Sequence, residues 1–270
     1  MIRHALAALF LFGLAQPCRS DPMLDVLVAA YPDFIAGYDA KYLIFKDGTH
    51  FQISDGSGAK SFEQLLAKPD IKDQFAIPYP LGTDLRKPEH DEDPGRIRNE
   101  PFFRKMYGDC RKGDATGHLK AVAWLPHRGG GTVMVTTVNG VHARLATVSH
   151  ELEALPAEIT KYLVPTSGTY NCRAIAGTDR LSMHAYAAAI DINAKFGDYW
   201  RWPRNGKDSD WQSRIPPAIV EVFERNGFIW GGKWYHHDTF HFEYRPEIIA
   251  YAMQMKRSDG VDQSKLSNKK

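Results

Sequence analysis

The chain has 270 residues, of which 43% are hydrophobic and 24% are charged, as is typical of a globular protein with a sizeable core. The 34 basic residues nearly balance the 32 acidic ones, so the formal net charge is only +2. With no basic stripe interleaved with aromatics, this balance argues against nucleic acid as a partner. The oligomeric state does not follow from the sequence.

The first twenty residues predict a secretory signal peptide. Arg3 and His4 form a short basic region, and residues 5–15 are an apolar run, far shorter than a membrane span. Polar and turn-forming residues follow, so we expect cleavage near Ser20 and a periplasmic or secreted protein. A buried N-terminal helix is the alternative. No later segment is long and apolar enough to cross a membrane.

Residues 21–130 predict an N-terminal extension of short elements and loops. We expect a short helix within residues 21–40. Two β-prone runs within residues 41–54 are separated by Asp47-Gly48, which predicts a hairpin. The stretch 69–98 is rich in Pro, Asp, Lys and Arg, and we interpret it as a loop or a linker over the surface.

Residues 131–257 predict the main domain. A strand at 132–138 precedes an amphipathic helix at 141–155, and a second helix at 216–226 stops at Gly227. Residues 228–230 and 240–244 are expected to be antiparallel strands, and residues 258–270 a polar, frayed tail. Helices and strands segregated in this way predict an α+β fold, a small antiparallel sheet with flanking helices.

Two cysteines remain once a signal peptide is removed, Cys110 and Cys172. An even pair in an oxidising compartment predicts a disulfide. Two buried free thiols are the alternative. The spacing of the two cysteines does not match that of a structural zinc site.

Two short stretches carry the residues of a predicted metal site. His184 and Asp191 lie within the first, residues 182–193, and Asp238 and His241 within the second, residues 238–243. Together they offer two imidazoles and one carboxylate as metal ligands, and a second carboxylate remains. A hydrolytic zinc site needs three protein ligands, an open position for water, and a base beside it. Asp191 sits between isoleucines, where an unpaired carboxylate is costly; its structural alternative is a carboxylate held by backbone amides.

The alternation of residues 240–244 places His241 and Glu243 on one strand face, so a turn or bulge near Asp238 is needed to bring its carboxylate round. His236 and His237 are rival ligands that we assign to an exposed loop. Ser57 and Lys60 match the serine–lysine spacing of penicillin-binding enzymes, but no Lys-Thr-Gly partner exists in the sequence.

The pattern Ser182-x-His184, Asp191 and Asp238-x-x-His241 resembles the M15 family of zinc peptidases, the D-Ala-D-Ala carboxypeptidase and dipeptidase group. The resemblance runs from about residue 139 to residue 246, and it favours the branch with VanY-like carboxypeptidases and phage L-alanyl-D-glutamate endopeptidases. It implies a hedgehog/D-Ala-D-Ala-peptidase-like fold. The first 130 residues have no clear counterpart in the motif.

The resemblance also implies roles. His184, Asp191 and His241 match the zinc ligands, Asp238 the catalytic carboxylate, and Arg173 the arginine that stabilises the developing oxyanion. Arg180 is a rival for the last role. Ser182 is expected to touch substrate or to turn the chain, and Trp234 to wall the cleft or to pack in the core.

These expectations combine into one hypothesis, an exported zinc peptidase that hydrolyses peptidoglycan stem peptides through zinc-activated water. The competing hypothesis is a non-catalytic zinc domain that binds cell-wall peptide or a protein partner; a serine enzyme using Ser57 and Lys60 is a further rival. The chain departs from the family at Ala187, where glycine is usual. If that position needs a positive φ, alanine is strained there.

Overall fold

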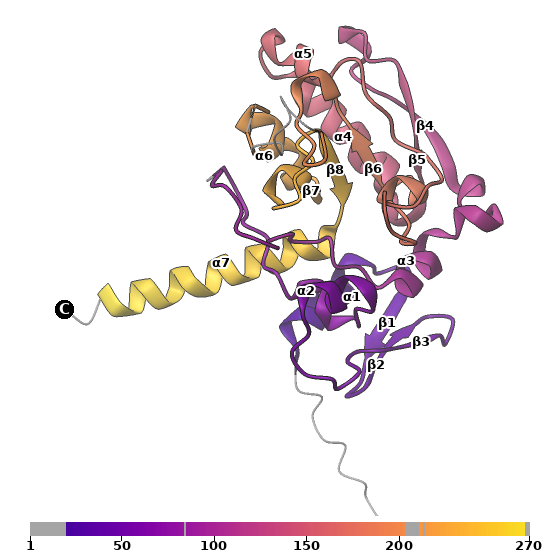
Figure 1. The fold of residues 1–270 in the computed structure, drawn as a ribbon, viewed down its shortest axis with the longest axis vertical. Helices are drawn as coiled ribbons and strands as arrows, with labels where there is room; N and C mark the ends of the chain where they lie inside the picture. Colours follow the sequence, from indigo (N-terminus) through magenta and orange to yellow (C-terminus); the bar gives the residue numbers. More distant parts are fainter. Residues whose placement is uncertain (1–19, 84, 203–210, 213, 268–270) are drawn as a thin grey trace, which may run out of the picture.

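The computed structural model describes residues 20–83, 85–202, 211–212 and 214–267 (Figure 1). The predicted signal peptide therefore lies outside the described residues, apart from Ser20. Within the described ranges, no helix combines the length and apolar character needed to cross a membrane. These residues form helices and three small antiparallel sheets, which confirms the predicted α+β class.

The N-terminal extension begins with the predicted short helix, α1 (Pro22–Ala30). It is followed by a three-stranded antiparallel sheet of β1 (Ile35–Tyr38), β2 (Tyr42–Phe45) and β3 (His50–Gln52). The β2–β3 turn holds Gly48 at φ +82°, a left-handed conformation that glycine adopts without steric cost. This confirms the predicted hairpin.

The chain then runs through α2 (Phe62–Ala67) to α3 (Glu100–Tyr107), a helix that the sequence analysis did not predict. Residues 69–98 between them are largely irregular, as expected. Part of this stretch lies on the surface, as at the exposed Arg86 and His90, but the expectation is wrong for its end, where Asp93 and Arg98 are buried. Both side chains have ion-pair partners in the C-terminal half, which offset the cost of burying their charges.

The central part of the chain forms a two-stranded antiparallel sheet and two helices. The strands are β4 (Leu119–Ala123) and β5 (Thr132–Thr136), and the helices are α4 (Val141–Glu153) and α5 (Thr160–Leu163). The predicted strand and amphipathic helix correspond to β5 and α4, whereas β4 was not predicted.

The third sheet is the one that positions the candidate site. Its strand order is β6-β8-β7, from β6 (Ala189–Asp191), β8 (His241–Tyr244) and β7 (Phe228–Trp230), and both pairings are antiparallel. Helix α6 (Pro217–Arg225) precedes β7. The predicted helix and the two predicted antiparallel strands are confirmed.

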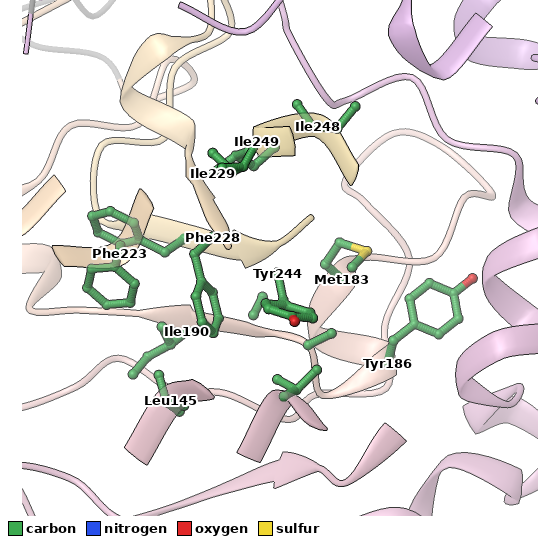
Figure 2. Packing of buried hydrophobic residues seen from close by; sticks show 14 of the residues in the cluster. Leu145, Met183, Tyr186, Ile190, Phe223, Phe228, Ile229, Tyr244, Ile248 and Ile249 are labelled. Atoms are coloured by element: carbon green, nitrogen blue, oxygen red, sulfur yellow. The ribbon is translucent and has the colours of Figure 1, made fainter. Parts of the chain in front are cut away.

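Aromatic packing fixes this sheet against α6. The rings of Phe223 and Phe242 stack with centroids 3.8 Å apart, and Phe228 meets Phe223 edge to face. Figure 2 shows Phe223 and Phe228 packed near Ile190 and Tyr244, and Phe242 belongs to the same buried cluster. Phe242 belongs to the same strand as His241, so packing on one face of β8 holds the polar residues of its other face in place.

The predicted frayed tail is wrong as far as the structure describes it. Helix α7 runs over Pro246–Ser267, and residues 268–270 lie outside the described part. Its first turns are packed, with Ile248, Ile249 and Ala252 buried, while its C-terminal part projects away from the rest of the molecule (Figure 1). The run of good helix formers at residues 252–257 carries the helix into the polar segment. Polarity alone was therefore a poor guide to where the helix ends.

Short 3-10 helices connect these elements. They are η1 (Lys72–Phe75), η2 (Cys110–Lys112), η3 (Asp114–His118), η4 (Pro126–Arg128), η5 (Val138–Gly140), η6 (Ala157–Ile159), η7 (Met183–Tyr186), η8 (Ala194–Phe196) and η9 (Gly231–Lys233).

Buried polar contacts join the extension to the C-terminal half. The Tyr31 hydroxyl donates to Glu247 at 2.7 Å, and Arg245 donates to the same carboxylate at 2.6 Å. The Tyr79 hydroxyl donates to Glu224 at 2.7 Å. Removing one partner of such a buried set leaves the other unsatisfied, so the two parts stabilise each other.

We predict that Phe102→Ala lowers the free energy of unfolding by about 3–5 kcal/mol, the usual cost of emptying a buried phenylalanine site. Phe102 is fully buried in the extension, and its ring meets those of Tyr31, Phe45 and Phe51. Denaturant unfolding, followed by tryptophan fluorescence, measures the change. Tyr42→Ala is the control at an exposed position, where a loss below about 1 kcal/mol is expected.

Candidate metal centre

Three predicted ligands meet where β6 and β8 pair. Asp191 ends β6 and His241 begins β8, and the antiparallel register places them directly opposite each other. His184 comes from η7, whose first turn is capped by the Ser182 hydroxyl accepting from the His184 backbone N–H at 3.3 Å. Local pairing and one capped turn therefore bring together residues up to 57 positions apart in sequence.

The three ligand atoms form a nearly regular triangle. His184 Nε2 lies 3.1 Å from Asp191 Oδ1 and 3.1 Å from His241 Nδ1, and His241 Nδ1 lies 2.9 Å from Asp191 Oδ1. Tetrahedral zinc with bonds of about 2.0–2.1 Å holds such atoms about 3.3 Å apart. The donor set and its spacing therefore fit zinc after small outward shifts, and among the described residues this is the group suited to a metal ion.

Hydrogen bonds behind the ligands fix which ring nitrogen faces the site. His184 Nδ1 lies 2.6 Å from the Thr169 carbonyl oxygen, which requires Nδ1–H and leaves Nε2 for a metal. His241 Nε2 lies 3.2 Å from Glu243 Oε2, which leaves Nδ1. Both are the supports that metal-binding histidines usually have.

Glu243 is a residue whose importance the sequence analysis missed. Its carboxylate lies 3.4 Å from Arg98 Nη1 and 3.4 Å from Arg245 Nη1, both buried. Burial opposes its ionisation, but the charge of Arg98 and the hydrogen bond from His241 lower the pKa of Glu243 to about 2. The histidine and glutamate two positions apart on a strand were the available signal, because such residues share a face.

Without a metal, a proton takes the metal's place. Burial opposes the charged imidazole, but hydrogen bonds to Asp191 and Glu243 raise the pKa of His241 to about 10. Burial likewise disfavours the Asp191 carboxylate, and the charges and hydrogen bonds of His184 and His241 outweigh it and hold the pKa of Asp191 well below its usual range. The surroundings thus stabilise positive charge where a cation would bind.

Asp238 reaches the same site through a turn, as predicted. The His241 N–H donates to the Asp238 carbonyl at 3.1 Å, and the turn directs the carboxylate toward the ligands. Its Oδ1 is buried and has no hydrogen-bond partner among the described residues. Burial and the negative charge of Asp191 raise the pKa of Asp238 to about 7. An unsatisfied carboxylate of this kind marks a place where a water, proton or ion belongs.

The ligands and Asp238 line a cleft of about 320 Å³. Arg173, Ser182 and Trp234 also line it, so every residue of the predicted site faces one space. Arg180 is not among the lining residues; its guanidinium donates to the Arg96 carbonyl at 3.1 Å instead. The structure therefore brings Arg173, and not its rival, to the metal site.

Residues 176–244 match the family model described as D-alanyl-D-alanine carboxypeptidase, one of the M15 peptidases. This match supports an M15 family peptidase. It includes the three ligands and Asp238, while Arg173 and the N-terminal extension lie outside it. The match points to a peptidase acting on D-Ala-D-Ala-type substrates. No curated protein and no solved structure matches the chain.

Ala187 lies inside the M15 region in the left-handed conformation, with φ 52° and ψ 31°. This confirms that the position needs a positive φ, which costs a non-glycine residue about 1–2 kcal/mol. The methyl group is fully buried, and burying one such group contributes about 0.8 kcal/mol. Burial thus offsets part of the strain, and the turn still places His184 correctly.

The rival sites are arranged for other roles. His237 is buried, which corrects its assignment to an exposed loop, and His236 is held by the Asp93 carboxylate at 2.7 Å. Lys60 lies 2.6 Å from Asp73 and 3.0 Å from Asp55. Burial opposes its charge, but these carboxylates raise the pKa of Lys60, so the lysine cannot act as the base of a serine enzyme.

We predict that His184→Ala loses metal and hydrolytic activity together, because two of three ligands cannot complete the site. Metal content after dialysis, measured by inductively coupled plasma mass spectrometry, tests this. His150→Ala is the matched control on the exposed face of α4, and it should keep the metal. Retention of a full equivalent of metal by His184→Ala would exclude this ligand set.

Metal binding is also predicted to release about one proton at about pH 8, because the metal must displace the Nδ1 proton of His241. Because the pKa of His241 is raised, its protonation stabilises the fold fully at pH values below about 6.5, the ordinary histidine pKa. This stabilisation is lost as the pH rises toward about 10. Metal affinity should correspondingly rise by up to about tenfold per pH unit over this window. Calorimetric titration in two buffers of different ionisation enthalpy counts the protons, and a count near zero contradicts the assignment.

Proposed function

We propose that this protein is an exported, zinc-dependent peptidase that hydrolyses amide bonds in peptidoglycan stem peptides, of the D,D-carboxypeptidase or L-Ala-D-Glu endopeptidase type. The observation that carries the proposal is the pairing of a His184–Asp191–His241 group with the Asp238 carboxylate in one cleft, where Oδ1 of Asp238 has no hydrogen-bond partner among the described residues. The M15 match over the same residues supports it.

His184, Asp191 and His241 would hold the zinc ion. The second ring nitrogen of each histidine keeps its ring in place, in His184 through the Thr169 carbonyl and in His241 through the Glu243 carboxylate. Bound zinc would act as a Lewis acid and lower the pKa of water in the open coordination position. Three protein ligands are the usual number for a catalytic zinc site, because they leave that position free.

Asp238 is suited to move the proton. Burial raises the pKa of the Asp238 carboxyl above its usual range, which suits a group that accepts a proton from the attacking water and then donates it to the leaving amide nitrogen. Its buried Oδ1 has no competing hydrogen bond among the described residues. A module that only binds peptide has no use for such a group, so Asp238 favours catalysis over the non-catalytic alternative.

Arg173 would stabilise the negative charge that develops on the substrate carbonyl oxygen. Its charge acts on Asp238 and lowers the pKa of that carboxyl against the larger effect of burial, so the guanidinium lies within electrostatic reach of the reacting centre. Ser182 and Trp234 line the same cleft and would contact the peptide. Trp234 is held in place by its indole N–H, which donates to the Pro94 carbonyl at 2.8 Å.

Export is supported by the predicted signal peptide and by the Cys110–Cys172 disulfide, which the structure contains. Disulfides persist in oxidising compartments such as the periplasm or the cell exterior. The cell wall lies in those compartments, so the proposed location and the proposed substrate agree.

The decisive experiment is digestion of purified muropeptides with and without a chelator, followed by mass spectrometry. The mass of each product identifies the bond that is cut, and its loss with chelator and return with zinc shows metal dependence. Cleavage that persists in chelator, or no cleavage of any stem peptide by zinc-loaded protein, contradicts the proposal.

We predict that Asp238→Asn keeps zinc but lowers kcat by a factor of about 10²–10⁴, the usual contribution of a positioned acid–base group. The amide has nearly the same shape and cannot carry the proton. Steady-state kinetics on the cleaved muropeptide measures the loss, with Asp33→Asn on an exposed turn as the control. Wild-type turnover by the Asp238 variant would show that another group moves the proton.

A further inference from the structure

The loop that carries Arg173 is a short hairpin, residues 173–182, here called the Arg173 hairpin. Its ends are joined by the Ser182 N–H donating to the Arg173 carbonyl at 3.1 Å, and its middle by the Ile175 N–H donating to the Arg180 carbonyl at 2.8 Å. Arg173, Ile175 and Ser182 line the cleft. The hairpin is therefore one wall of the candidate site.

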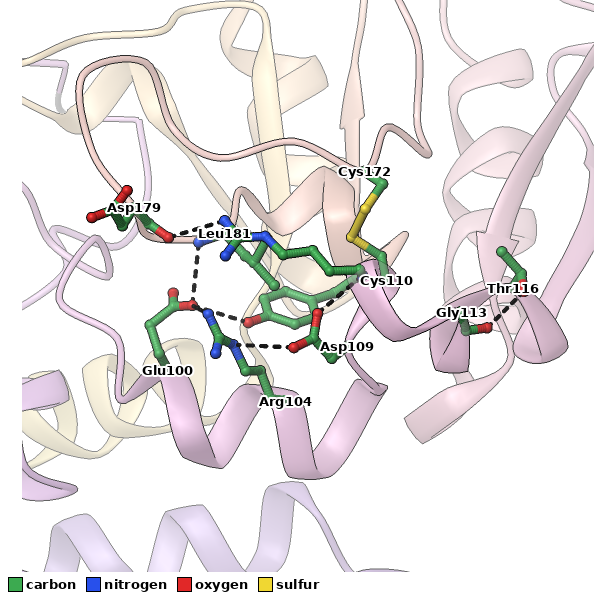
Figure 3. Close-up of a disulfide and its surroundings, with 11 residues drawn as sticks. Glu100, Arg104, Asp109, Cys110, Gly113, Thr116, Cys172, Asp179 and Leu181 are labelled. Atoms are coloured by element: carbon green, nitrogen blue, oxygen red, sulfur yellow. Dashed lines mark hydrogen bonds and ion pairs between the residues drawn. A yellow bond between two sulfur atoms is a disulfide. The ribbon is translucent and has the colours of Figure 1, made fainter.

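This hairpin rests on the N-terminal extension. The Cys110–Cys172 disulfide ties the residue just before Arg173 to η2. At the other side, the Arg111 guanidinium donates to the Asp179 carbonyl at 3.2 Å. Figure 3 shows the disulfide and Asp179 at two separate points along this loop.

Two further contacts hold the returning strand of the hairpin. The Leu181 N–H donates to the Glu100 carboxylate at 3.2 Å (Figure 3), and the Leu181 carbonyl accepts from the buried Arg98 at 3.3 Å. Both partners belong to the extension, which lies outside the residues that match the M15 family. The wall of the cleft is thus positioned by a part of the chain that lies outside the residues matched by the family model.

The Arg173 side chain lacks an anchor of its own. Its guanidinium makes no hydrogen bond or ion pair within the described part of the chain, and the residue is exposed. Its position is consequently set by its backbone, and the disulfide is the covalent restraint immediately before it. A displacement of about 1 Å can cost a catalytic group on the order of a hundredfold in rate.

We infer that the Cys110–Cys172 disulfide is a positioning device for Arg173, by which the N-terminal extension holds the Arg173 guanidinium over the metal site. The inference rests on the proposed function, because it assigns the disulfide a part in turnover. A disulfide that serves stability alone would lower the unfolding temperature without acting through Arg173.

A double-mutant cycle separates these roles. We expect Cys110→Ser with Cys172→Ser to lower kcat about tenfold on the cleaved muropeptide, with KM and zinc content nearly unchanged. In an Arg173→Ala background the same pair of substitutions should change kcat less than twofold. An equal loss in both backgrounds, or no loss in either, overturns the inference.

Hydrogen exchange measured by mass spectrometry gives a readout that does not need activity. In the cysteine variant, amides of residues 173–182 should exchange faster, while those of β6 and β8 stay protected. Unchanged protection of the hairpin overturns the inference even if muropeptides are not the substrate. Inactivity of the parent protein together with faster hairpin exchange instead counts against the proposed function alone.

A milder variant covers the case in which the cysteine variant does not fold. Arg111→Ala removes the contact to Asp179 and keeps the disulfide, so a smaller loss of kcat, about two- to threefold, and local loss of protection at the hairpin are expected. Lys112→Ala is the matched control, an exposed neighbour on η2. Equal effects of both variants contradict the inference.

Discussion

The carboxylate of Glu243 is the group on which the rest of the site depends. It accepts the Nε2 proton of His241 on one side and lies against the guanidinium groups of Arg98 and Arg245 on the other. Arg245 in turn bonds to Glu247, which also accepts from Tyr31 of the extension. One buried chain of charge-assisted hydrogen bonds therefore runs from the N-terminal part of the molecule to a metal ligand.

This arrangement gives the extension a purpose beyond stability. The buried stretch before α3 supplies Arg98, which pairs with the Glu243 carboxylate behind His241. The stretch after α3 supplies Cys110, which is bonded to Cys172 next to the wall of the cleft. Two sides of the candidate site are thus positioned by residues outside the segment 176–244 that matches the M15 family model.

Much of the site could be predicted from the sequence because its ligands follow local rules. Strand alternation placed His241 beside Glu243, and the need for a turn at Asp238 followed from the same alternation. The partners of Glu243 could not be predicted, since Arg98 is 145 residues away and a sequence shows no long-range pairing. For the same reason residues 69–98 were taken for surface, because the partners of the buried Asp93 and Arg98 include His236 and Glu243, which are far away in the sequence.

The two ring N–H groups that join His241 to Asp191 and to Glu243 have a consequence for how the candidate site is formed. Hydrogen bonds within the protein hold the three candidate ligands in a triangle. The positions of these three side chains are therefore set by strand pairing and by the groups behind them. A cation bound there would enter a site whose shape the polypeptide itself defines.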